Sequence, residues 1–230
     1  MTFILNIETA TQRCSVGLAR DGETLAIRES DEKNIHAAKV TVFSEEVCGE
    51  AGIKMKTLDA VAVSMGPGSY TGLRIGVSAA KGFCYALDIP LIGVSTLQSM
   101  ALGACEDDEG EDVLYCPMID ARRMEVYTAL FDRKNKQLKD IEALIVDEHF
   151  FEVELQNHTI KYFGDGAEKC REILDPKGML FLDNIKPSAR DLALIAQKKF
   201  QEGSFENLAY FEPFYLKDFI AGKPKVKGLR

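Results

Sequence analysis

The chain of 230 residues carries a formal net charge of −8, and 46% of its residues are apolar. This composition is typical of a folded protein with a sizeable core, and the acidic balance argues against nucleic-acid or lipid binding through the overall charge. Six cysteines without a C-x-x-C pair, and no apolar run of about 18 residues, predict a cytoplasmic protein with free thiols and no membrane contact.

A first lobe is predicted over residues 1–104 as an α/β unit. Its opening reads as an antiparallel meander, because apolar runs alternate with short polar turns and Asp21-Gly22 is a strong hairpin signal. Gly52 is placed to end the first helix, and Ser95 or Thr96 can cap the last one. The expected strands cover residues 3–7, 14–20, 23–29, 59–65 and 90–94, and the expected helices cover residues 36–51, 70–87 and 96–104.

An acidic stretch at residues 105–112 has no hydrophobic periodicity and is predicted to separate two halves. After it, residues 113–132 (VLYCPMIDARRMEVYTALFD) repeat the pattern of residues 3–21 (FILNIETATQRCSVGLARD). Both segments place an acidic residue, Asp120 or Glu8, between an apolar strand and a polar turn. This echo predicts a second lobe, over residues 105–187, that shares the architecture of the first.

The rest of the chain continues with helical signals. Residues 160–174 (IKYFGDGAEKCREIL) are expected to form a strand, a glycine turn and a helix. Residues 188–230 are expected to return toward the first lobe, with Ser188 capping a helix that Gly203 ends. The tail that follows is basic and contains Lys223, Lys225, Lys227 and Arg230. It is either a solvated end of the chain or a segment that contacts RNA or an acidic partner.

Residues 64–77 read SMGPGSYTGLRIGV and carry glycine at positions 66, 68, 72 and 76. A glycine inside a helix is unfavourable by roughly 1 kcal/mol relative to alanine, so close packing must compensate for those in this helix. The apolar residues of segment 70–87 span an arc of roughly 200°, about twice that of a surface helix. The helix is therefore expected to pack on two sides, with both neighbours inside the chain or with one in a partner protein.

The glycine-rich segment does not match the sequence patterns of two enzyme classes. Five residues separate Gly66 from Gly72, and Leu73 stands where a nucleotide-binding P-loop requires lysine. No G-x-S-x-G elbow surrounds Ser69, which argues against a serine hydrolase.

Two other sets of polar residues bear on catalysis. Glu8 and Asp120 have either structural roles in their turns or the role of holding a metal-bound water or a nucleotide between two lobes, as in a sugar kinase. His36 is followed four residues later by Val40, so no metal-binding pair is expected on that helix.

Four segments carry a resemblance to a known family: ILNIETATQRCSVGL, SMGPGSYTGLRIGVSAAKGF, IDARRMEVY and EPFYLKD. They occur in order across nearly the whole chain, and they are similar to the TsaB family, also called YeaZ. The resemblance implies a two-lobed, actin-like α/β fold (ASKHA, ribonuclease H-like) with mixed sheets flanked by helices. It also implies a non-catalytic partner of TsaD, the enzyme that forms threonylcarbamoyladenosine beside the tRNA anticodon, in an assembly that the ATPase TsaE joins.

The resemblance further implies that the first-lobe helices contact TsaD and can also form a homodimer. Close packing across that boundary would then offset the glycines of the helix. The residues expected at this interface are His36, Gly68, Ser69, Tyr70, Gly72, Leu73, Arg74, Gly76, Val77 and Ala80.

No catalytic residue, metal site or tightly bound cofactor is expected, and tRNA is contacted only through the complex. Weak nucleotide binding is assigned to Glu8, Thr9, Asp120 and Arg122, with ATP or ADP at the TsaD interface. The alternative function is an actin-fold ATPase or small-molecule kinase that uses Glu8, Asp120 and the GPGS loop at residues 66–69. A third hypothesis, a peptidase, predicts cleavage that depends on Ser69 or is sensitive to chelators.

Overall fold

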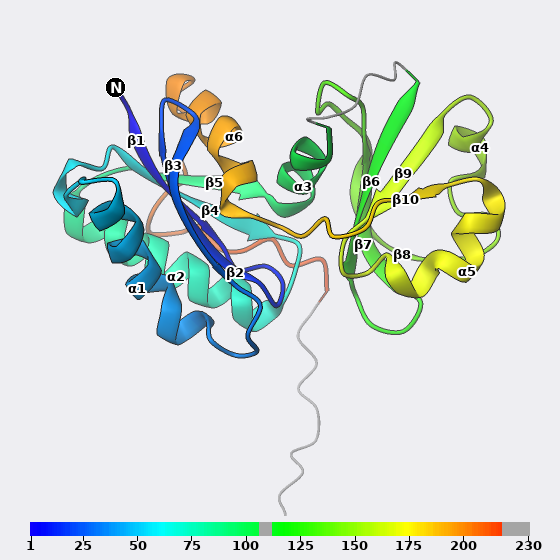
Figure 1. The fold of residues 1–230 in the computed structure, drawn as a ribbon, viewed down its shortest axis with the longest axis horizontal. Coiled ribbons are helices and arrows are strands. Elements are labelled where there is room, and N and C mark those ends of the chain that lie inside the picture. Colours follow the sequence, from blue (N-terminus) through cyan, green and yellow to red (C-terminus); the bar gives the residue numbers. More distant parts are fainter. Residues whose placement is uncertain (106–111, 218–230) are drawn as a thin grey trace, which may run out of the picture.

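The computed structural model describes residues 1–105 and 112–217, and these residues form two lobes (Figure 1). The first lobe is built on a five-stranded sheet of order β3-β2-β1-β4-β5. β2 runs antiparallel to both β1 and β3, whereas β4 runs parallel to both β1 and β5. The strands are β1 (Phe3–Glu8), β2 (Cys14–Arg20), β3 (Glu23–Ser30), β4 (Ala60–Gly66) and β5 (Leu91–Ser95).

The second lobe repeats this topology. Its sheet has the order β10-β9-β6-β7-β8, in which β7 is antiparallel to β6 and β8, and β9 is parallel to β6 and β10. The predicted echo is therefore confirmed strand by strand, and Glu8 and Asp120 are the last residues of the equivalent strands β1 and β6. The strands are β6 (Val113–Asp120), β7 (Glu125–Phe131), β8 (Gln137–Ile145), β9 (Thr159–Phe163) and β10 (Leu180–Phe181).

Helices cover both faces of the first sheet, with α1 and α2 below it and α6 above it in Figure 1. The helices of the described chain are α1 (His36–Glu50), α2 (Tyr70–Leu87), α3 (Thr96–Cys105), α4 (Glu152–Leu155), α5 (Arg171–Leu174) and α6 (Ala189–Gln201). Three short 3-10 turns accompany them: η1 (Met55–Thr57), η2 (Glu168–Cys170) and η3 (Asp175–Lys177).

Alternate residues of β1 face opposite layers of the first lobe. Leu5 and Ile7 pack into the cluster beneath α1 and α2. Ile4 packs on the other side with Leu192 and Ala196 of α6. Because parallel strands covered on both faces bury nearly every side chain, β1 and β4 read as continuous apolar runs.

Helix α3 joins the two lobes. Leu97, Met100 and Ala101 are fully buried in a cluster that includes Tyr115 and Phe131 of the second sheet. The same helix contacts α6, β4 and β5 of the first lobe. In Figure 1, α3 lies between the sheets of the two lobes.

Most local predictions are confirmed, and one element differs. Asp21 and Gly22 form the β2–β3 hairpin with positive φ angles of 51° and 88°, and Ser188 caps α6 by accepting the Arg190 N–H at 3.2 Å. The helix expected up to residue 174 is instead split into η2, α5 and η3. Pro176 lies within η3, and α5 ends before it because a proline nitrogen cannot donate the hydrogen bond that would extend a helix.

All six cysteines are buried free thiols, as their apolar surroundings indicate. The first-lobe core holds Cys14, Cys48 and Cys84; Cys116 and Cys170 lie in the second-lobe core, and Cys105 lies in the α3 cluster. Across the described residues, no helix has the length and apolar character needed to cross a membrane. Residues 106–111 of the predicted linker, and the basic tail from residue 218 onward, lie outside the described residues.

Candidate functional site

A cleft of about 780 Å³ lies between the two lobes. The first lobe contributes the β1–β2 turn and the start of α2, and the second lobe contributes the carboxyl end of β6. Four parts of the chain supply most of the lining: residues 10–12, 67–72, 119–122 and 214–217. This position agrees with the general rule that ligands bind near the carboxyl ends of strands in α/β folds.

The β1–β2 turn fixes where α2 begins. The Ser69 N–H donates to the carbonyl of Ala10 at 2.6 Å, and the Ser69 hydroxyl caps the helix by accepting the Gly72 N–H at 3.3 Å. A Cβ on Gly68 would lie 2.4 Å from the Ala10 oxygen. Glycine is therefore required at position 68 because the turn backbone passes directly beside it.

The glycines inside α2 face the same turn. A Cβ on Gly72 would lie 2.2 Å from the carbonyl oxygen of Thr9, and a Cβ on Gly76 would lie 2.2 Å from the Thr9 hydroxyl oxygen. The expectation that these glycines admit another subunit is therefore wrong, since their neighbour is the chain's own β1–β2 turn. A bulky side chain at position 76 would collide with Thr9 and destabilise the fold, so such a variant cannot test partner binding.

The residues expected at a partner interface fall into three groups. Leu73, Gly76, Val77 and Ala80 are buried within the chain and cannot present a surface to another protein. The inter-lobe cleft is lined by His36, Gly68, Ser69, Tyr70 and Gly72. Arg74 is exposed and donates to the Tyr70 hydroxyl at 2.7 Å.

Glu8 does not reach the cleft. Its carboxylate is fully buried, and one oxygen accepts hydrogen bonds from the Ala10 N–H at 2.6 Å and the Ser64 hydroxyl at 2.9 Å. The other oxygen has no hydrogen-bond partner within the part of the chain that the structure describes. Burial raises the pKa of Glu8 from 4.5 to about 7, although the bonds from Ala10 and Ser64 oppose the rise. Thr9 is also fully buried, so neither residue lines the cleft.

Asp120, the equivalent of Glu8 in the second lobe, does line the cleft together with Arg122. Its carboxylate accepts the Arg122 N–H at 3.0 Å and forms an ion pair with Lys169. Burial opposes ionisation, but the hydrogen bond from Lys169 is among the contacts that lower the pKa of Asp120. Asp165 lies beside it, accepts the Asp120 N–H at 3.1 Å, and has its pKa raised by burial.

His36 is held by the first lobe. Its Nε2 lies 3.0 Å from the Thr11 carbonyl and 3.3 Å from the Arg13 carbonyl, so this nitrogen donates a hydrogen bond. Val40, one turn later, is buried in the core. Within residues 1–105 and 112–217, no group of three or more His, Cys, Asp or Glu side chains is arranged to hold a metal ion.

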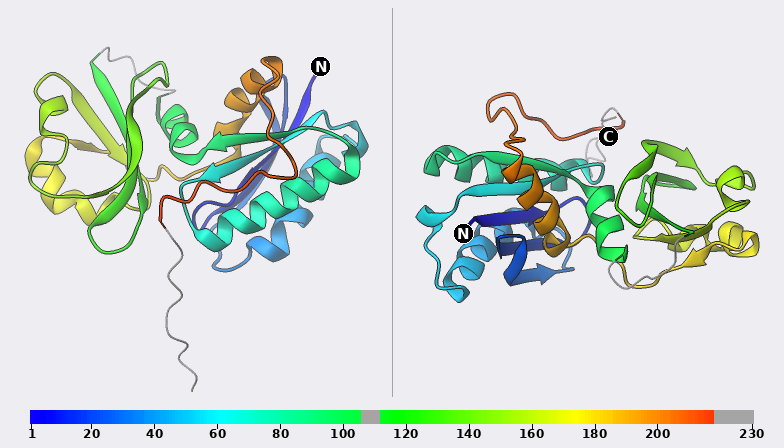
Figure 2. Two further views of the ribbon diagram at one scale, coloured as in Figure 1. Left: turned by 180° about the vertical axis from the view of Figure 1, so that it is seen from behind. Right: turned by 90° about the horizontal axis from the view of Figure 1, so that it is seen from above.

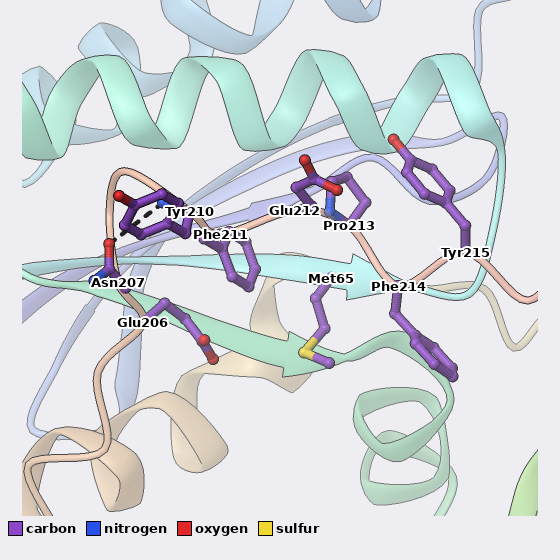
Figure 3. Close-up of a pocket in the computed structure, with 9 residues that line it drawn as sticks. All are labelled: Met65, Glu206, Asn207, Tyr210, Phe211, Glu212, Pro213, Phe214 and Tyr215. Carbon is purple, nitrogen blue, oxygen red and sulfur yellow. Dashed lines mark hydrogen bonds between the residues drawn. The ribbon is translucent and has the colours of Figure 1, made fainter.

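One side of the cleft is lined by the end of residues 205–217, a segment that we call the strap; its return to the first lobe was expected from the sequence, but its place at the cleft was not. It follows α6, runs along the first lobe beside α2 and ends at the second lobe (Figure 2). A hollow of about 540 Å³ lies between the strap and Met65 of β4 (Figure 3). The motif EPFYLKD contains the end of the strap, but its lack of apolar periodicity gave no indication that it packs.

Comparison with known proteins places the chain in a family. The family model described as "TsaD: tRNA N6-adenosine threonylcarbamoyltransferase" matches residues 30–225. A curated protein of Escherichia coli (strain K12), named "tRNA threonylcarbamoyladenosine biosynthesis protein TsaB", is 33% identical over 227 residues, which cover 96% of each chain. The chain belongs to the TsaB (YeaZ) family.

Solved structures agree with the TsaB assignment and with the actin-like fold. A structure titled as an uncharacterized protein with similarity to peptidase YEAZ, from Pseudomonas aeruginosa, superimposes with a TM-score of 0.81 at 25% identity, covering 94% of this chain and 100% of that one. The activator of 2-hydroxyisocaproyl-CoA dehydratase from Clostridium difficile, solved with bound ADPNP, gives a TM-score of 0.50 at 12% identity, covering 90% and 99%. The similarity to the dehydratase activator supports a shared fold and nothing about function.

Proposed function

We propose that this TsaB-family chain acts in the formation of threonylcarbamoyladenosine on tRNA, beside the anticodon, as a non-catalytic partner of a TsaD homologue. TsaE joins the assembly, and tRNA is contacted through the complex. One observation carries the non-catalytic part of the proposal: the Glu8 carboxylate, which a kinase of this fold would turn toward a nucleotide, is fully buried in the first lobe. The name of the Escherichia coli relative supports the pathway.

An actin-fold ATPase or kinase remains the second candidate, because the cleft is large enough for a nucleotide. The residues assigned to nucleotide binding fit this role poorly. Glu8 and Thr9 are buried beneath the surface of the cleft, and the charge of Asp120 is neutralised by its ion pair with Lys169. We therefore place ATP or ADP at the TsaD interface and not in a tight site within the chain.

The buried positions of α2 require a revised interface. The exposed side of this helix away from the cleft includes Arg74, Ser78 and Tyr85, and the Tyr85 side chain is 84% exposed. Val42 of α1 is also exposed. We place the TsaD contact, and the competing homodimer contact, on this outer side of α1 and α2.

Ser78 offers a direct test, because it is exposed near the middle of α2. Ser78→Arg should weaken binding to the TsaD homologue at least about ten-fold, since a large charged side chain inside an interface prevents close packing. Complex mass by light scattering, with and without ATP, gives partner, stoichiometry and nucleotide dependence together. Threonylcarbamoyladenosine formation by TsaD and TsaE should fall in parallel.

The matched control is Ser204→Arg, which makes the same change at an exposed position just after α6. It should leave both binding and modification unchanged. Equal binding by the two variants would count against the proposed surface. ATP hydrolysis by the purified chain that is lost in Asp120→Asn would favour the kinase reading instead.

A further inference from the structure

The strap is fixed to the first lobe along its length. The Glu206 N–H donates to the Leu91 carbonyl at 2.9 Å, and Phe211 is buried in the first-lobe core. Lys81 of α2 donates to the carbonyls of Ala209 and Phe211, each at 3.2 Å. These contacts cover the β5 edge of the sheet and hold the strap against α2.

The second half of the strap leads to the cleft. The Phe214 N–H donates to the Met65 carbonyl at 2.7 Å, and the Tyr215 ring lies 4.9 Å from the Tyr70 ring at the start of α2. Figure 3 shows Tyr215 beside this end of the helix, with Phe214 turned away from it. A Cβ on Gly66 would lie 2.7 Å from the Phe214 carbonyl oxygen, so glycine at this position lets the strap pass closely.

Lys217 then crosses to the second lobe. Its ammonium forms an ion pair with Glu125 of β7 and lies 5.7 Å from the centroid of the Tyr127 ring. Both side chains of the ion pair are partly exposed, at 38% and 27%. An ion pair of this kind is modest in strength and is weakened by salt, so it can open and close.

We propose that the strap is a clasp that holds the inter-lobe cleft closed. The lobes are also joined by buried packing at α3, whose Leu97, Met100 and Ala101 are fully buried. Loss of the Lys217–Glu125 contact lets the second lobe swing about that joint and widens the cleft. Opening of two domains about a few joining residues is a common conformational change.

The test measures the distance between the lobes in the isolated full chain, so its outcome does not depend on TsaD. Spin labels are attached at Glu32→Cys in the first lobe and Glu148→Cys in the second, both exposed, whereas the native thiols are buried. Pulsed electron paramagnetic resonance then gives the distribution of inter-label distances. Lys217→Glu should increase the long-distance population about five-fold, the change expected for loss of a partly exposed ion pair.

Charge exchange makes the test specific. The double variant Lys217→Glu with Glu125→Lys should restore the original distribution, and Lys134→Glu, an exposed lysine in the β7–β8 turn, should leave it unchanged. The proposal is overturned if Lys217→Glu leaves the distances unaltered. It is equally overturned if the exchanged pair stays as open as the single variant.

Discussion

Replacing Gly72 by alanine should lower the free energy of unfolding by about 3 kcal/mol, the upper range for adding a methyl group to a packed interior. The new Cβ would meet the Thr9 carbonyl oxygen at 2.2 Å, and this oxygen belongs to backbone that also carries the cleft lining. Neither the helix nor the turn can move away without breaking the Ser69–Ala10 hydrogen bond. Urea unfolding followed by circular dichroism measures the change.

Gly82 provides the control within the same helix. No atom lies within 4 Å of a Cβ built there, so Gly82→Ala should raise the free energy of unfolding by about 0.5 to 1 kcal/mol through better helix propensity. Opposite signs at positions 72 and 82 are the expected result. Stabilisation at both would show that the turn yields easily and that packing does not require glycine at position 72.

Replacing Glu8 by glutamine should stabilise the protein at neutral and alkaline pH. The folded-state pKa of Glu8 is about 7 and the ordinary value is 4.5, so between these values the unfolded chain loses its proton while the folded protein keeps it. The contribution of Glu8 to the free energy of unfolding therefore falls as pH rises from about 4.5 to about 7 and is constant above that, with a total loss of about 3 kcal/mol. Glutamine imitates the protonated acid and removes this loss.

The measurement compares the free energies of unfolding of both proteins across pH 4.5 to 8. The variant should gain about 3 kcal/mol at pH 8 and almost nothing near pH 4.5, because other groups titrate alike in the two proteins. Glu45→Gln, at an exposed position of α1, should show no such trend. A gain that is the same at every pH would mean that folding does not raise the pKa of Glu8 above its ordinary value.

The paired lobes could be predicted from the sequence because local patterns repeat. The segments that start at Phe3 and Val113 share a strand, an acid, a turn and a second strand, and the two sheets have equivalent strand orders. Turn and cap residues such as Asp21, Gly22 and Ser188 act through their immediate neighbours. The turns and helix starts that they form can therefore be predicted from the sequence without knowledge of the fold.

The candidate site was less predictable because it depends on contacts distant in sequence. The spacing of Gly72 and Gly76 correctly indicated close packing, but only the structure shows that Thr9 is the neighbour. Glu8 and Asp120 hold equivalent places in the chain, yet one is enclosed by Ser64 and the other faces the cleft beside Lys169. The strap has no periodic pattern, since it is held mainly by backbone hydrogen bonds and single aromatic side chains.

The reactivity of the buried cysteines can be used to measure local opening of the structure. Each of three apolar clusters contains at least one thiol, and burial raises the pKa values of Cys84 and Cys116 above their ordinary value. A thiol reacts with an alkylating reagent only when its surroundings separate and the thiolate forms. The rates at which Cys84, Cys105 and Cys116 are modified, followed by mass spectrometry, would thus report separately how often each lobe and the joint between them come apart.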